Sequence, residues 1–190
     1  MLATLVFGKS MVASQRFFLK EIPPRANVLI LGGGTGWILN EIAKTNVSCE
    51  IWYIDASAKM LEHARKNAGV LRVHFVHGTE DDIPPAITFN VLITNFYLDL
   101  FAEQKLDDVV RKVTFSLTRD ACWIVTDFLN RKRWQRLLLF VMYSFFNVVA
   151  HLDNRHLPDW NVAIQRGGYR KIDSGLFYLG FIESAIFKRS

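Results

Sequence analysis

A glycine-rich loop followed by an acidic residue is the feature of this sequence whose spacing could bind a nucleotide-like ligand. The stretch VLILGGGTGWIL, residues 28–39, contains Gly32, Gly33, Gly34 and Gly36. Glycines directly after an apolar run let the backbone approach a ligand closely and adopt positive φ angles. Asp55 ends the next apolar run, and a carboxylate there can accept hydrogen bonds from both hydroxyls of a ribose. Together they predict a pocket for an adenosine-type cofactor; the competing interpretation is an ordinary strand–helix turn that binds nothing.

The spacing of the glycines bears on which cofactor is bound. In the dinucleotide fingerprint G-x-G-x-x-G/A, the third small residue lets the following helix pack closely. That position is Trp37 here, which is too large, whereas Gly32, Gly34 and Gly36 match G-x-G-x-G. At this point the sequence resembles the class I S-adenosylmethionine-dependent methyltransferases. A nicotinamide-dependent reductase is the enzymatic alternative, and a non-catalytic S-adenosylmethionine-binding module is the non-enzymatic one.

The resemblance extends over residues 27–188 and rests on four motifs. LILGGGTG matches the cofactor loop, YIDAS the ribose carboxylate, VHGTEDDIP the adenine loop, and FNVLITNFYLDLF the strand and loop beneath the methyl group. The pattern is closest to the small-molecule enzymes grouped with the ubiquinone and menaquinone biosynthesis methyltransferases. It implies S-adenosyl-L-methionine as the cofactor and no metal ion. The implied cofactor-binding residues are Gly32, Gly33, Gly34, Gly36, Asp55, Ala56, Thr79, Glu80 and Asn95.

The chain departs from the family pattern at two positions. Ile30 stands where the family usually has an aspartate two residues before the first loop glycine, and Thr79 stands in place of the adenine-loop aspartate. Because Glu80 follows directly, either Thr79 or Glu80 could face the adenine amine. The loop and Asp55 are both present, so we interpret the two departures as variations within the family.

Methyl transfer from a sulfonium depends more on holding the nucleophile, methyl carbon and sulfur in line than on an acid or a base. A general base is most useful for a phenol or hydroxyl acceptor. Each candidate for that role also has an ordinary structural interpretation, such as capping of a helix or exposure on the surface. The sequence therefore assigns no catalytic residue. The candidates are Tyr97, Asp99, Asp127, His151, Asp153 and His156.

Missing motifs narrow the methyl acceptor to a small molecule. Asn95, Phe96 and Tyr97 contain no counterpart of the Asn/Asp-Pro-Pro-aromatic motif of enzymes that methylate adenine in nucleic acids. Methylation of cytosine C5 needs a cysteine nucleophile, but Cys49 and Cys122 begin strands, at the edge away from the ligand. We therefore expect no nucleic-acid substrate. The family resemblance implies a small-molecule acceptor, and the apolar segment described next favours a hydrophobic one. The residues expected to bind the acceptor are Tyr97, Trp134 and Tyr143.

The stretch RKRWQRLLLFVMYSFF is expected to belong to an inserted helical segment, residues 129–160, that follows the fifth strand. Its apolar residues surround the helix, so one face needs a partner besides the domain. We predict a lid over the acceptor; the alternatives are a homodimer contact and a peripheral membrane contact through residues 131–150. The apolar run at 137–150 is too short to span a bilayer. Four basic residues would suit an anionic partner: Arg131, Lys132, Arg133 and Arg136.

Strands that alternate with helices must position these residues. Two later apolar runs lie so close together that they predict an antiparallel hairpin. The fold class is therefore α/β: a Rossmann-like, doubly wound, seven-stranded sheet, mostly parallel and ending in an antiparallel hairpin. Helical spacing is present at Leu106, Val109, Val110, Val113 and Leu117. The expected strands are Val28–Leu31, Cys49–Asp55, Val70–Val76, Phe89–Asn95 and Ala121–Phe128, with Tyr169–Phe177 and Gly180–Lys188 as the hairpin.

Composition and cysteine content bound the remaining possibilities. With 190 residues of which 51% are hydrophobic, the chain is expected to form one methyltransferase domain, 1–190, with residues 1–26 as a covering helix. The net charge of +5 permits an anionic partner without establishing one. Cys49 and Cys122 would lie on strands separated by two others, too far apart for a disulfide. Free thiols indicate a reducing compartment, and we expect the cytoplasm.

Overall fold

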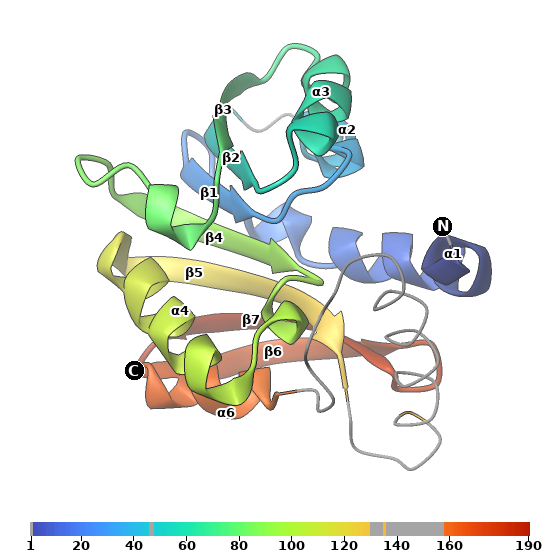
Figure 1. Ribbon diagram of the computed structural model, residues 1–190, viewed down its shortest axis with the longest axis vertical. Helices are drawn as coiled ribbons and strands as arrows, with labels where there is room; N and C mark the ends of the chain where they lie inside the picture. Colours follow the sequence, from blue (N-terminus) through green and yellow to red (C-terminus); the bar gives the residue numbers. More distant parts are fainter. Residues whose placement is uncertain (1, 46–47, 130–134, 136–157) are drawn as a thin grey trace.

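The computed structural model describes residues 2–45, 48–129, 135 and 158–190. Its centre is a seven-stranded sheet in the order β3-β2-β1-β4-β5-β7-β6 (Figure 1). The first five strands in this order run parallel, whereas β7 is antiparallel to both β5 and β6. This arrangement confirms the predicted fold class, including the hairpin at the end of the sheet.

The element bounds are as follows. The strands are β1 Asn27–Leu31, β2 Glu50–Asp55, β3 Arg72–His77, β4 Phe89–Asn95, β5 Leu117–Phe128, β6 Tyr169–Phe177 and β7 Ile182–Arg189. The α-helices are α1 Leu2–Arg16, α2 Trp37–Lys44, α3 Ala58–Asn67, α4 Glu103–Phe115 and α6 Trp160–Arg166. The short 3₁₀ helices in the described part of the chain are η1 Leu19–Glu21, η2 Glu80–Asp82 and η3 Leu98–Leu100.

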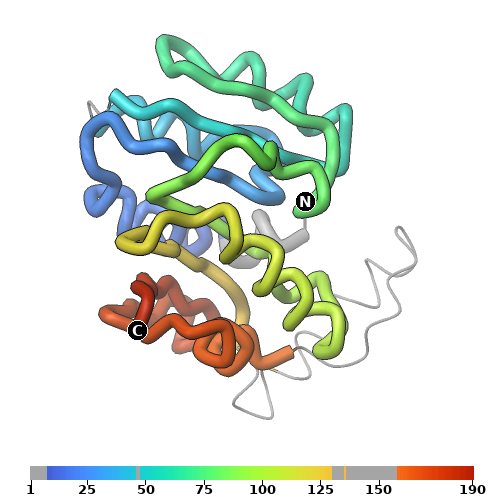
Figure 2. Tube along the Cα trace, turned by 90° about the vertical axis from the view of Figure 1, so that its left-hand side faces the viewer, coloured from blue at the N-terminus to red at the C-terminus, as the bar shows by residue number. Residues whose placement is uncertain are grey.

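Helices cover both faces of the sheet, which explains the unbroken apolar runs of the central strands. Alternate residues of β1 enter different cores: Leu29 faces the core built with α4 and α6, and Ile30 faces the core built with α2 and α3. Figure 2 shows α4 and α6 lying together on one side of the sheet, where they also contact each other. On the other side, α1 packs against β6, β7 and α2.

The predicted element boundaries at Leu117 and at Val70 are wrong. Leu117 was expected on the buried face of a helix, but α4 ends at Phe115 and Leu117 opens β5, where it pairs with Phe89. Leu117 is buried in either arrangement, so its spacing could not distinguish the two. Val70 was expected in a strand and instead lies in the turn after α3, where it is 94% exposed.

The cysteines lie as the strand order required. Cys49 directly precedes β2 and Cys122 lies in β5, and β1 and β4 separate these two strands. Both are buried free thiols. Burial raises the pKa of Cys122 to about 11, so its reactive thiolate form is scarce near neutral pH.

Most of the segment expected to form a lid, 129–160, lies outside the described residues. This includes Trp134 and Tyr143, which were expected to bind the acceptor, and the four basic residues before the apolar run. The division into one domain with a lid therefore stays a prediction, as do the homodimer and membrane alternatives. Within the described part of the chain, no helix has the length and apolar character needed to cross a membrane.

Candidate active site

The candidate residues gather at one edge of the sheet. The glycine loop follows β1, Asp55 ends β2, the adenine loop follows β3, and Asn95 ends β4. Because these strands are parallel, their carboxyl ends meet at the same edge. Strand order reverses between β1 and β4, and ligands of doubly wound sheets bind at that reversal. The structure thus brings together candidate cofactor residues that lie as far apart in the sequence as Gly32 and Asn95.

The loop glycines serve different purposes. A Cβ atom on Gly32 would collide with the Tyr97 ring, one on Gly33 with the Tyr53 ring, and one on Gly36 with the backbone of Ala64 in α3. The protein's own packing therefore requires glycine at these three places.

Gly34 is the exception among the loop glycines. It has a φ of +65°, and a Cβ built there would meet no atom within 4 Å. The backbone conformation favours glycine, but no neighbouring protein atom does. Gly34 is thus the loop position that leaves room for a ligand to approach the backbone.

Asp55 holds the loop at this same residue. Its Oδ2 accepts a hydrogen bond from the Gly34 N–H at 2.8 Å, and its Oδ1 accepts one from the Ser57 N–H at 2.8 Å. The Tyr53 hydroxyl donates to the Gly34 carbonyl oxygen at 3.2 Å. Each carboxylate oxygen retains acceptor capacity beyond one bond, so Asp55 can fix the loop and still accept ribose hydroxyls.

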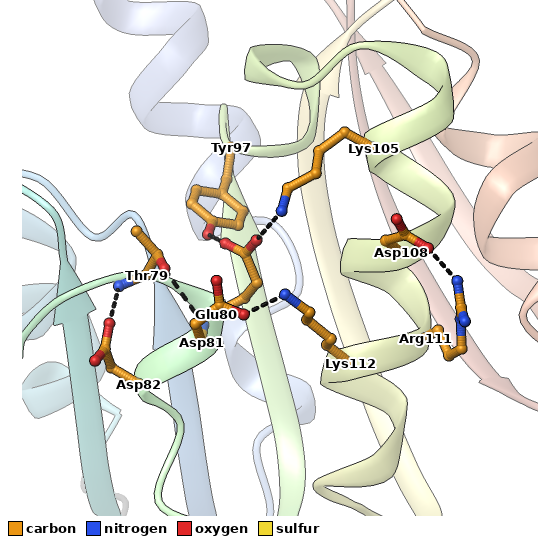
Figure 3. Close-up of polar contacts among 9 residues, drawn as sticks. All are labelled: Thr79, Glu80, Asp81, Asp82, Tyr97, Lys105, Asp108, Arg111 and Lys112. Carbon is orange, nitrogen blue, oxygen red and sulfur yellow. Dashed lines mark hydrogen bonds and ion pairs between the residues drawn. The ribbon is translucent and has the colours of Figure 1, made fainter.

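The adenine loop folds into η2, and Thr79 caps it. The Thr79 hydroxyl accepts a hydrogen bond from the Asp81 N–H at 3.3 Å, while the Thr79 N–H donates to Asp82 Oδ2 at 2.9 Å (Figure 3). Glu80 points away from this cap and is 5% exposed. Its Oε2 accepts a hydrogen bond from the Tyr97 hydroxyl at 2.9 Å.

The loop after β4 has a strained start and a firm anchor. Phe96 has a φ of +52°, which is uncommon for a bulky residue. Backbone strain of this kind clusters at functional sites. Its N–H donates to the Thr126 carbonyl oxygen at 2.7 Å. Further along, the N–H groups of Leu98 and Asp99 donate to Asp127 Oδ2 at 3.1 and 3.3 Å. The end of β5 therefore fixes the loop that carries Tyr97.

Two of the proposed general bases have other roles in this geometry. Burial and the nearby Glu80 carboxylate raise the pKa of Tyr97, so the phenol keeps its proton and donates a hydrogen bond to Glu80. Burial and repulsion from Asp99 raise the pKa of Asp127, whose oxygens accept backbone N–H bonds. His151, Asp153 and His156 lie outside the described residues. Sequence reasoning missed Tyr53 and Phe96, because neither residue type marks a site on its own.

The site fits a ligand that carries several donors. Asn95 Oδ1 is buried and has no hydrogen-bond partner within the described part of the chain. A buried acceptor without a partner is costly, and an amine or hydroxyl of S-adenosylmethionine would satisfy it. The open side of Gly34 gives such a ligand access to the loop.

Residues 28–120 match the model of a protein family described as "Methyltransferase domain". The protein is an S-adenosylmethionine-dependent methyltransferase. The matched range contains the glycine loop, Asp55, the adenine loop and Asn95. This methyltransferase therefore uses S-adenosylmethionine as its methyl donor, and the nicotinamide-dependent alternative is set aside. No curated protein sequence matches the chain significantly.

Solved structures with similar folds include three bacterial proteins. A protein from Listeria monocytogenes described as an S-adenosylmethionine-dependent methyltransferase is 17% identical, with a TM-score of 0.69 over 94% of this chain and 99% of that one. A protein from Nostoc punctiforme described as an O-methyltransferase is 16% identical, with a TM-score of 0.72 over 98% and 59%. Magnesium protoporphyrin IX methyltransferase from Synechocystis is 14% identical, with a TM-score of 0.69 over 96% and 83%. At these identities the likeness concerns the fold alone.

Proposed function

We propose that the methyltransferase acts on a small hydrophobic molecule. The observation that supports this proposal is a third apolar cluster, separate from the two cores and located at the carboxyl edge of the sheet. Phe128 and Phe181 are buried in it, and Phe96 packs on Phe128 with ring centroids 4.7 Å apart. Phe96 directly precedes Tyr97, whose ring lies on the glycine loop. Aromatic side chains at that edge suit an apolar acceptor that carries a ring.

The reaction needs orientation above all. When bound, S-adenosylmethionine supplies an electrophilic methyl carbon: its bond to the sulfonium sulfur breaks as a bond to the acceptor nucleophile forms, leaving a neutral thioether. A hydroxyl acceptor would release its proton to the bulk solvent outside the site. Asp55 and Gly34 would hold the cofactor, and Asn95 would accept a hydrogen bond from one of the cofactor's donor groups. The aromatic cluster would exclude water from the reacting atoms. Correct alignment alone can lower the activation barrier by several kcal/mol.

The acceptor class is tested with a small panel. Purified protein and S-adenosylmethionine are incubated with a phenol carrying an alkyl chain, an alkylated quinol, unsubstituted catechol, and single-stranded DNA. We expect S-adenosylhomocysteine to accumulate with the two apolar acceptors at least about tenfold faster than with catechol, because one added apolar group contributes of the order of 1–3 kcal/mol. Faster turnover with catechol or with DNA would contradict the proposal.

Phe96 gives a site-directed version of this test. In Phe96→Ala, we expect kcat/KM for the alkylated phenol to fall at least about tenfold, which corresponds to about 1.4 kcal/mol of lost contact. The dissociation constant for S-adenosylhomocysteine should stay within about threefold. Phe115→Ala is the matched control, since Phe115 is 84% exposed at the end of α4, at the opposite edge of the sheet. Equal loss in both variants would count against an acceptor role for Phe96.

Trp134 and Tyr143 complete the acceptor site in the proposal. They are large rigid surfaces with a polar tip, which suits a ring that also carries oxygen. Their contribution rests on the sequence alone and can be measured with the same assay in Trp134→Ala and Tyr143→Ala. Loss of acceptor turnover with unchanged cofactor affinity supports a lid, whereas a change in mass by light scattering supports a dimer contact.

A further inference from the structure

Glu80 is the buried acid of the adenine loop, and its side-chain partners in the described part of the chain come from other elements. Tyr97 donates to one carboxylate oxygen at 2.9 Å, and Lys105 of α4 approaches the other with its Nζ at 3.6 Å (Figure 3). Only 3% of the Glu80 side chain is exposed, against 49% for Lys105. A buried carboxylate is tolerated only where donors or cations compensate it, and these two groups do so.

The Tyr97 ring connects Glu80 to the glycine loop. Tyr97 is 8% exposed, and its ring lies where a Cβ of Gly32 would be. Phe101 packs edge-on against the same ring, with centroids 5.1 Å apart. The ring thus fills the space between the adenine loop and the backbone of the glycine loop, so its placement determines how those two loops sit relative to each other.

The neighbours of Glu80 have separate duties. Asp81 forms an ion pair with Lys112 of α4, and its side chain is 57% exposed. Asp82 accepts the Thr79 N–H within the cap of η2. Among the three acids of this loop, Glu80 alone is buried. Its position in the interior is therefore explained by Tyr97 rather than by the folding of η2.

We propose that Glu80 is a positioning residue, which holds the Tyr97 ring against the glycine loop and does not contact the adenine amine. Glu80 affects cofactor affinity only through the position of Tyr97. Asp127 serves the same ring from its other end, because it binds the N–H groups of the two residues that follow Tyr97. The inference concerns cofactor binding and is independent of the proposed acceptor.

A double-mutant cycle separates positioning from direct contact. Dissociation constants for S-adenosylhomocysteine are measured by calorimetry in wild type, Glu80→Ala, Tyr97→Phe and the double variant. We expect each single change to weaken binding about five- to tenfold. The double variant should bind as well as whichever single variant binds less tightly, because the effects of residues that act as one unit do not add. Additive losses would overturn the proposal. Asp81→Ala, which also removes an ion pair to α4, is the matched control and should bind normally; a loss equal to that in Glu80→Ala would also overturn it.

A second ligand makes the same distinction without relying on the cycle. S-inosylhomocysteine replaces the adenine amine with a carbonyl oxygen. If Glu80 acts through Tyr97, the ratio of the two dissociation constants stays as in wild type in both Glu80→Ala and Glu80→Gln, and the glutamine variant recovers most of the affinity. A ratio that collapses in Glu80→Ala, or that shifts toward the inosine form in Glu80→Gln, would mean that Glu80 faces the base. The glutamine variant keeps an acceptor for Tyr97, so the comparison holds even if the alanine variant fails to fold.

Discussion

Replacing Gly34 with valine should abolish binding of S-adenosylmethionine and of its demethylated product. Gly34 is the loop glycine whose Cβ position is open, and Asp55 already binds its N–H at 2.8 Å. A β-branched side chain would occupy the space the cofactor needs. The φ of +65° at position 34 is also unfavourable for valine. We expect calorimetry to detect no binding at ligand concentrations about a hundredfold above the wild-type dissociation constant, a loss of more than about 2.7 kcal/mol.

Gly69→Val separates this effect from backbone strain. Gly69 has a φ of +54°, and a Cβ there also meets nothing within 4 Å, but it lies between α3 and β3, away from the glycine loop. Both variants should lose a similar amount of melting temperature, because the left-handed conformation costs roughly 1–2 kcal/mol in each. Only Gly34→Val should lose the cofactor. A folded Gly34→Val protein with normal affinity would show that the ligand does not approach this loop.

Replacing Asp55 with alanine should weaken cofactor binding at least about tenfold. The change removes the acceptor for the ribose hydroxyls, and hydrogen bonds to a charged group contribute about 1.5–3 kcal/mol each. It also removes the acceptor of the hydrogen bonds that the Gly34 and Ser57 N–H groups donate to Asp55. A moderate fall in the melting temperature without ligand is therefore expected as well, which the sequence alone did not indicate.

Two further variants divide the Asp55 effect. Asp55→Asn keeps one oxygen acceptor, so it should recover part of the fold stability while binding the cofactor less well than wild type. Asp120→Ala removes an exposed carboxylate in the first part of β5, away from the carboxyl edge of the sheet. It should change neither the fold stability nor the cofactor affinity. If Asp55→Ala loses stability but binds the demethylated cofactor with unchanged affinity, the assignment to the ribose is wrong.

The sequence predicted the sheet and the edge at which the candidate residues meet, since both depend on patterns local to each strand. Apolar runs that end in glycine or aspartate define the parallel strands and their carboxyl ends, and the short gap between the last two runs defines the hairpin. The end of α4 was not predictable at Leu117, because a buried residue satisfies both a helix and a strand.

The sequence also could not predict the roles of residues whose partners are distant in the chain. Gly32 is glycine because of Tyr97, and Gly33 because of Tyr53. In each case the partner is remote in sequence and reaches the loop only once the sheet has formed. The same holds for Glu80, whose partner Tyr97 lies on the next strand's loop. Sequence spacing identified the acid, but only the fold shows which side chain it binds.

The most direct test of the central claim follows the methyl group itself. Wild-type protein and Gly34→Val are each given S-adenosylmethionine with a deuterated methyl group and the alkylated phenol, and both products are quantified by mass spectrometry. The account predicts that wild type transfers the labelled methyl to the phenol with one S-adenosylhomocysteine formed per methyl, and that Gly34→Val transfers none. Equal labelling by both proteins, or no labelled phenol with the wild type, would contradict it.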